Sequence, residues 1–147
     1  MMEMHNIIGD VGALDGALVV APARGDDTPE LAWGDAFFYF APDGRMPEHT
    51  QPYGTIITKN YPDDSSSGLD TPGRFRVNIH VGGERVAQLV DTTAQPSDAD
   101  VFVRHPLYGD AGWISVVNPA ERTAAAVLAL LGDAHHAARA RAERRKR

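Results

Sequence analysis

Apolar residues recur at two different spacings along this chain, and each spacing predicts one kind of element. Helical spacing predicts a short helix over residues 2–14 and another over residues 84–90. Short apolar runs bounded by turn residues predict strands, which we place at 17–21, 31–40, 53–59 and 101–103, the second of them broken near Gly34-Asp35. The run Phe37-Phe38-Tyr39-Phe40 is apolar on both faces, which predicts a strand inside the sheet with little solvent on either side.

The clearest alternation lies in residues 74–81. One face of this predicted strand is apolar and consists of Phe75, Val77, Ile79 and Val81. The other face carries Arg74, Arg76, Asn78 and His80. A strand with one apolar and one polar face is typical of an antiparallel sheet that is covered on one side.

The last third of the chain predicts a strand followed by a long helix. The strand is Trp113–Val117, and Asn118-Pro119-Ala120-Glu121 has the residue types that open a helix. An apolar stripe then predicts that the first five turns pack on the sheet; its members are Val127, Leu128, Leu131, Ala134 and Ala138.

The strands occur in groups rather than alternating singly with helices. The order α-β(3-4)-α-β(2)-α predicts an α+β fold in two layers, with a mainly antiparallel sheet and helices on one side. We expect a single domain over residues 1–138 and a basic helix end over residues 139–147.

Composition narrows the class of protein. A hydrophobic fraction of 43% and a charged fraction of 23% are those of an ordinary globular domain. The chain has no cysteine, which excludes disulfides, thiolate catalysis and sulfur-bound zinc. It lacks a signal-like start and an apolar run long enough to span a membrane, so the cytoplasm is the expected location. Residues 61–73 have the composition of a solvated loop, and their three aspartates do not have EF-hand spacing.

The net charge of −6 is unevenly distributed. Residues 1–138 hold eight basic and nineteen acidic side chains, whereas the C-terminal end carries Arg139, Arg141, Arg144, Arg145, Lys146 and Arg147. Such an end suits nucleic acid or an acidic partner. It equally fits the preference of cations for a helix C-terminus, and the acidic body opposes a phosphate backbone.

Several short motifs together resemble one bacterial family, the domain-of-unknown-function family 6194. The motifs span nearly the whole chain: Trp33-Gly34-Asp35, Phe37-Phe38-Tyr39, Gln51-Pro52-Tyr53-Gly54-Thr55-Ile56, Phe75-Arg76-Val77-Asn78-Ile79, His105-Pro106-Leu107-Tyr108-Gly109, Gly112-Trp113-Ile114-Ser115-Val116 and Ala134-His135. The second half also resembles, more distantly, the MmcQ/YjbR-like superfamily. That resemblance implies a secretion-chaperone-like fold, although the usual lysine of the mid-chain strand is absent. Neither family implies an activity.

Two groups of side chains are candidate binding residues. Arg76, Asn78 and His80 lie on one strand face, where they can line a groove for a polar or anionic ligand; a solvated outer face has the same pattern. His105, Tyr108 and Trp113 surround a glycine-rich turn and can form the rim of an apolar site. A plain turn before a core-anchoring Trp113 is the simpler interpretation of this second group.

Metal binding, nucleophilic catalysis and phosphate binding have weaker signals in the sequence. His49, His80 and His105 are a conceivable metal set, but they lie on separate elements, and we expect no metal and no cofactor. Ser115 lies within a strand without a nucleophile elbow, and no phosphate-binding loop is present.

Three hypotheses of function follow from these residues. The leading one is a non-enzymatic domain that binds a small molecule or a partner on its open sheet face, with dimerisation as a further expectation. The second is nucleic-acid binding through residues 139–147. The third is a small-molecule enzyme that uses His80 or His105 as a general acid or base.

Overall fold

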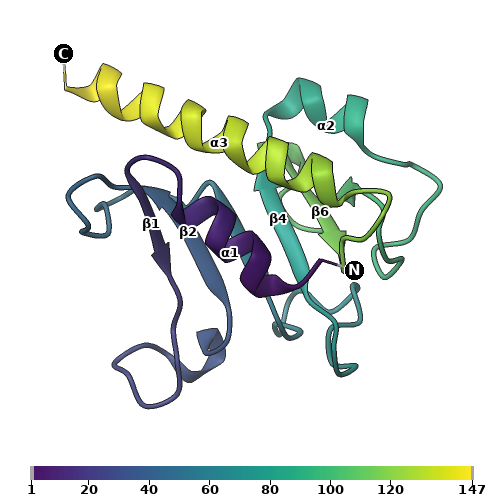
Figure 1. Ribbon diagram of the computed structural model, residues 1–147. Helices are drawn as coiled ribbons and strands as arrows, with labels where there is room; N and C mark the ends of the chain where they lie inside the picture. The colour runs from purple at the N-terminus through teal and green to yellow at the C-terminus, as the bar shows by residue number, and fades with distance from the viewer. Residues whose placement is uncertain (1, 147) are drawn as a thin grey trace.

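The computed structural model describes residues 2–146 and has two layers, a sheet and its covering helices (Figure 1). The six strands are β1 (Ala17–Val20), β2 (Ala36–Phe40), β3 (Gly54–Ile57), β4 (Arg76–His80), β5 (Val103–Arg104) and β6 (Trp113–Val117). They lie in the order β1-β2-β3-β4-β6-β5, and every neighbouring pair is antiparallel. The α-helices are α1 (Met4–Gly12), α2 (Gly83–Leu89) and α3 (Ala124–Arg145). The predicted α+β class and element order are confirmed.

The helices cover one face of the sheet. Figure 1 shows α1 and α3 across the strands, where α3 contacts β2 and β4 and α1 contacts β1, while α2 lies beside β6. The core between the layers consists of alternate strand residues, as the period-two pattern predicted. Its strand members include Phe38, Ile56, Val77, Ile79, Ile114 and Val116, which meet Ile7, Val11, Val127 and Leu131 of the helices.

Gly54 lies where the Leu131 side chain of α3 packs closely against the sheet. A Cβ at this position would lie 2.7 Å from Leu131 Cδ2 and 3.2 Å from Phe38 Cδ2. A larger residue would push against two side chains of a packed core, which costs stability. The glycine therefore lets the helix lie directly on β3.

The predicted start of the last helix is wrong. Helix α3 begins at Ala124, and Asn118 has a left-handed backbone with φ of 46°. Its side chain instead accepts a hydrogen bond from the Phe75 amide at 2.9 Å and donates to the Gly73 carbonyl at 3.2 Å. Asn118 thus joins the end of β6 to the start of β4, which a local pattern of cap residues cannot reveal.

Several predicted strands are shorter than expected, among them the one at 53–59, which is β3 (Gly54–Ile57). In residues 31–40, a 3₁₀ turn, η1 (Glu30–Ala32), replaces the first part, and β2 starts only at Ala36. Gly34, with φ of 89°, separates the two. The strand expected at 101–103 is β5, which covers only Val103–Arg104.

The loop expected to be solvated, residues 61–73, is partly buried. Ser67 and Leu69 are inaccessible to solvent, and Asp64 is half-buried against β4, while Asp63 and Ser65 remain exposed. Polar composition alone predicts solvation, but a buried arginine on β4 gives this loop a partner. None of the helices within residues 2–146 has the length and apolar character needed to cross a membrane.

Candidate functional site

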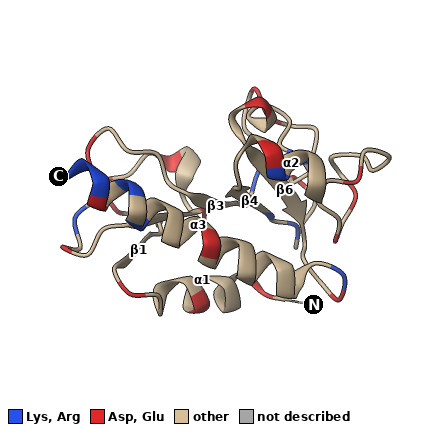
Figure 2. Cartoon of the chain, turned by 90° about the horizontal axis from the view of Figure 1, so that it is seen from above, with Lys and Arg blue, Asp and Glu red and all other residues tan. Residues whose placement is uncertain are grey.

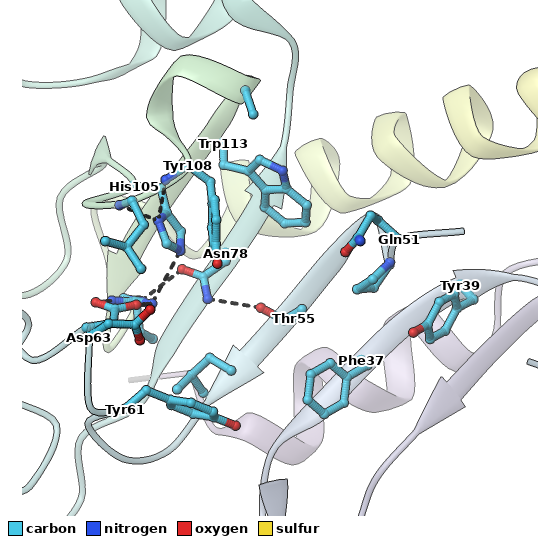
Figure 3. Close-up of a pocket in the computed structure, with 16 residues that line it drawn as sticks. Phe37, Tyr39, Gln51, Thr55, Tyr61, Asp63, Asn78, His105, Tyr108 and Trp113 are labelled. Atoms are coloured by element: carbon cyan, nitrogen blue, oxygen red, sulfur yellow. Dashed lines mark hydrogen bonds and ion pairs between the residues drawn. The ribbon is translucent and has the colours of Figure 1, made fainter. Parts of the chain in front are cut away.

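The sheet face opposite the helices is hollowed into a cavity of about 670 Å³. Strands β2, β3, β4 and β6 form its floor, because every second residue of each strand points away from the core. The segments at residues 51–52, 61–64 and 105–111 form its walls. Five aromatic side chains line it, Phe37, Tyr39, Tyr61, Tyr108 and Trp113 (Figure 3).

Arg76 lies at the polar end of this floor and is only 2% exposed. Its two terminal nitrogens donate to the two carboxylate oxygens of Asp64 at 2.9 and 2.6 Å, and Nη1 also donates to Ser67 Oγ at 3.0 Å. The hydrogen bonds from Arg76 hold the pKa of Asp64 below its ordinary value, against the effect of burial. The expectation that Arg76 lies on an open face is therefore wrong, because a guanidinium inside a sheet needs a counter-charge and the 61–69 loop supplies one.

Asn78 is also buried, at 3% exposure, and connects three strands. Its Oδ1 accepts hydrogen bonds from Arg76 Nε at 2.9 Å and from Ser115 Oγ at 2.7 Å. Its Nδ2 donates to Thr55 Oγ1 at 2.9 Å. The open polar row that the sequence predicted is in fact a fixed network under the cavity, with Thr55 as its member on β3.

His105 is drawn into the same network from the loop after β5. Its Nε2 lies 3.4 Å from Arg76 Nη2, and its Nδ1 accepts hydrogen bonds from the amides of Leu107 at 3.0 Å and Tyr108 at 3.1 Å. Burial, and then the neighbouring Arg76 charge, lower the pKa of His105 to about 4. The imidazole is therefore neutral at physiological pH.

His80, the third residue of the predicted row, lies outside the cavity. Its ring packs edge-on against Trp113 with ring centroids 5.6 Å apart, and its Nε2 contacts the Ala111 carbonyl at 3.2 Å. Burial, followed by the charge of Arg141, lowers its pKa. Arg76, Asn78 and His105 thus lie together at the cavity, whereas His80 packs against the Trp113 indole outside it.

Tyr108 and Trp113 form one rim of the cavity. Tyr108 is 54% exposed, and its ring stacks at a tilt on His105 with centroids 4.8 Å apart. Trp113 is half-buried on β6 and faces the cavity rather than the core (Figure 3). The rim interpretation of this group is therefore the better description of its position.

The opposite wall depends on residues that the sequence did not single out for this role. Asp35 is buried and accepts hydrogen bonds from the Thr58 amide, the Lys59 ammonium at 3.0 Å and the Tyr61 hydroxyl at 2.5 Å. Burial and the Asp35 carboxylate raise the pKa of Tyr61. In the sequence, the Trp33-Gly34-Asp35 motif drew attention to Asp35, but it does not indicate which groups donate hydrogen bonds to this carboxylate. Asp35 holds the Tyr61 ring in place.

The three histidines considered as a conceivable metal set do not come together. His49 belongs to the loop before β3 and does not line the cavity, and His80 and His105 are separated as described. Within residues 2–146, no three carboxylate or imidazole side chains are grouped as metal ligands.

The comparisons with known proteins identify a family without an assigned activity. A search of curated proteins and a search of solved structures each found no match to this chain. The resemblance to the MmcQ/YjbR-like superfamily has no support from them and stays a prediction. The model described as Family of unknown function (DUF6194) matches residues 2–147, and the chain therefore belongs to that family, as its motifs predicted.

Proposed function

We propose that this protein binds a small, flat, largely apolar molecule in the cavity on its helix-free sheet face. The observation that supports this proposal most strongly is the combination of aromatic walls with a buried polar floor in one recess of about 670 Å³. Ligand sites are typically recesses of this size, mostly apolar, with a few fixed polar groups that orient the ligand.

The walls remain partly open to solvent, which is unusual for so many aromatic rings. Leu107 and Tyr108 at the rim are among the most exposed large apolar side chains of the described residues. Exposed apolar groups gathered in one recess are typical of an interaction site rather than of an ordinary surface. A flat ligand between Tyr61 and Trp113 would cover exposed apolar surface of the recess and remove it from water.

The floor and one wall are rigid before any ligand arrives. The Arg76–Asp64 pair fixes the polar end, and Asp35 fixes the Tyr61 ring through its hydroxyl. A preorganised site binds more tightly because little conformational entropy is lost on binding.

Binding is favoured over the acid–base hypothesis because of the state of the two histidines. A residue whose pKa is about 4 is a weak base at neutral pH, and the Nδ1 of His105 is already occupied by two amides. His80 lies behind Trp113, outside the cavity. Neither imidazole therefore combines a position in the cavity with the pKa of an effective general base.

The neutral planar dye Nile red tests this proposal, because its emission rises on transfer to an apolar site. We expect it to bind the native protein and to lose that binding in Ile57→Trp, whose indole would fill the cavity from β3. Leu31→Trp is the matched control, since Leu31 is exposed and does not line the cavity. Equal binding to both variants, or none to the native protein, would overturn the proposal.

Native mass spectrometry of the purified protein complements the dye. It detects any small molecule retained from the cell, and it reports the subunit number, on which the expected dimer depends. A retained molecule that Ile57→Trp excludes and Leu31→Trp keeps would support the same site.

A further inference from the structure

The polar floor of the cavity presents donors rather than acceptors. Asn78 Oδ1 is occupied by Arg76 Nε and Ser115 Oγ, and Asn78 Nδ2 donates to Thr55 Oγ1. Because the Thr55 oxygen accepts this bond, its own hydroxyl proton is available to donate. This chain of hydrogen bonds therefore leaves the Thr55 hydroxyl as a donor to a molecule in the cavity.

The proton of His105 can be assigned from its neighbours. The amides of Leu107 and Tyr108 can only donate, and both point at Nδ1, at 3.0 and 3.1 Å. Nδ1 is therefore the unprotonated nitrogen of a neutral ring, and the proton is on Nε2. His105 is 5% exposed and lines the cavity, so this N–H lies at the polar end of the recess (Figure 3).

That N–H faces another donor. Arg76 Nη2 lies 3.4 Å from His105 Nε2, and a guanidinium has no acceptor atom. The remaining hydrogen bonds of Arg76 go to Asp64, Ser67 and Asn78. Among the described residues, Nε2–H has no recorded acceptor, and one ligand oxygen within hydrogen-bond distance of both nitrogens would satisfy both donors.

The charges of the site decide which oxygen fits. Asp64 already balances Arg76, and the carboxylate of Asp63, which is exposed, also lines the cavity. Since His105 is neutral, the lining has more negative than positive charge. The negative lining would repel a carboxylate or a phosphate. A carbonyl oxygen is a strong hydrogen-bond acceptor and carries no net charge, so it avoids this repulsion.

We propose that the ligand is a neutral planar molecule with a carbonyl group, such as an aromatic amide, a lactam or a conjugated ketone. Its oxygen accepts hydrogen bonds from both His105 Nε2 and Arg76 Nη2, and its ring lies between the walls of Tyr61 and Trp113. The Thr55 hydroxyl supplies a further donor. This inference rests on the proposed function, because it names the ligand class of the same cavity.

Three bicyclic compounds that differ in one substituent test the inference by calorimetry. Naphthamide carries a neutral carbonyl, naphthoate a carboxylate, and methylnaphthalene no acceptor. We expect naphthamide to bind at least about tenfold more tightly than the other two, because only it satisfies the buried donors without adding charge.

His105→Asn is the variant that isolates the donor. An asparagine oxygen can accept the same two loop amides as Nδ1, as in an Asx turn, while its shorter side chain removes the Nε2–H from the cavity. We expect this variant to bind all three compounds alike. His80→Asn is the matched control and keeps the preference, since His80 does not line the cavity.

A measurement on the native protein avoids any question of whether His105→Asn folds. Two-dimensional NMR of the imidazole nitrogens reports which nitrogen carries the proton, and we expect Nε2–H at His105, with a shift of this signal when naphthamide is added. A proton on Nδ1 would overturn the inference.

The outcomes separate the inference from the function on which it rests. Tighter binding of naphthoate, or equal binding of the three compounds to the native protein, would overturn the carbonyl assignment and leave the cavity as a binding site. Failure of all three compounds and of Nile red would overturn the proposed function itself.

Discussion

His135 illustrates how one buried polar side chain can join three parts of the chain. Its Nε2 lies 2.7 Å from the Asp15 carbonyl, and its Nδ1 lies 2.9 Å from the Tyr53 hydroxyl. Because a carbonyl only accepts, Nε2 carries the proton and Tyr53 donates to Nδ1. The neighbouring His136 is exposed, because adjacent positions on a helix do not share a face.

Tyr53→Phe is expected to lower the free energy of unfolding by about 1–3 kcal/mol, because it leaves Nδ1 of His135 buried without a donor. Urea denaturation measures the loss. Tyr39→Phe is the control: the Tyr39 hydroxyl has no recorded hydrogen-bond partner among the described residues, and the tyrosine lines the open cavity. Equal losses in the two variants would contradict the role given to His135.

His105 makes stability depend on pH in a direction that its environment fixes. The unfolded chain takes up a proton below the ordinary pKa of 6.5, whereas the folded protein resists protonation down to about 4. The unfolded state therefore binds more protons in this range, and the free energy of unfolding falls as the pH falls from 6.5 toward 4.

The loss attributable to His105 is at most on the order of 3 kcal/mol. We expect His105→Asn to show a shallower decline than the native protein when urea denaturation is repeated across this pH range. Asp64 also has a lowered pKa and contributes to the decline at the acidic end in both proteins. Parallel curves for the two proteins would show that His105 is not the source.

At the level of elements, the start of α3 depends on a residue far away in the sequence. Asp100, with φ of 56°, accepts hydrogen bonds from the amides of Ala120, Arg122 and Thr123 and from the Thr123 hydroxyl. It performs the function that the sequence assigned to Asn118. The loop before β5 thus fixes the turn over residues 120–123, from which α3 starts.

Asp100→Ala is expected to cost about 1–3 kcal/mol, since it removes the amide cap and places alanine in a left-handed backbone. Thermal denaturation compares it with Asp98→Ala, which removes one local bond to the Gln95 amide in an exposed loop. Asp100→Asn should recover part of the loss, because asparagine tolerates this backbone and retains one acceptor. A loss no larger than that of Asp98→Ala would contradict the capping role.

Over the whole molecule, charge is the property that is most unevenly distributed. Figure 2 shows the basic residues gathered at the C-terminal end of α3, and Arg139 there contacts Glu143 at 3.0 Å and Asp15 at 3.7 Å. Helix α3 continues unbroken from the packed core into this end. Nucleic-acid binding by residues 139–147 stays a prediction.

We expect only weak, salt-sensitive binding of duplex DNA, because the rest of the chain is strongly acidic. Fluorescence anisotropy with a labelled duplex checks this. Deletion of residues 139–147 should abolish whatever binding is present, and the Ile57→Trp protein should retain it, since Ile57 is in the cavity. Affinity that survives the deletion or is insensitive to salt would contradict an electrostatic tail.

The cavity was only partly accessible to prediction from the sequence. Arg76 and Asn78 were placed on the correct face because alternation is a local property of a strand. Their burial was missed because it depends on Asp64, which lies twelve positions away in a loop that reads as solvated. The cytoplasmic location stays a prediction.

Apolar periodicity acts within one element, and the sequence alone was therefore enough to predict the α+β class, the order of elements and which strand residues face the core. The start of α3, the position of His105 rather than His80 beside Arg76, and the loop that closes over β4 are properties of the folded chain. Those outcomes depend on contacts between distant segments, such as the Asp100 bond to Thr123 and the Arg76–Asp64 ion pair, whose partners become neighbours only when the chain has folded.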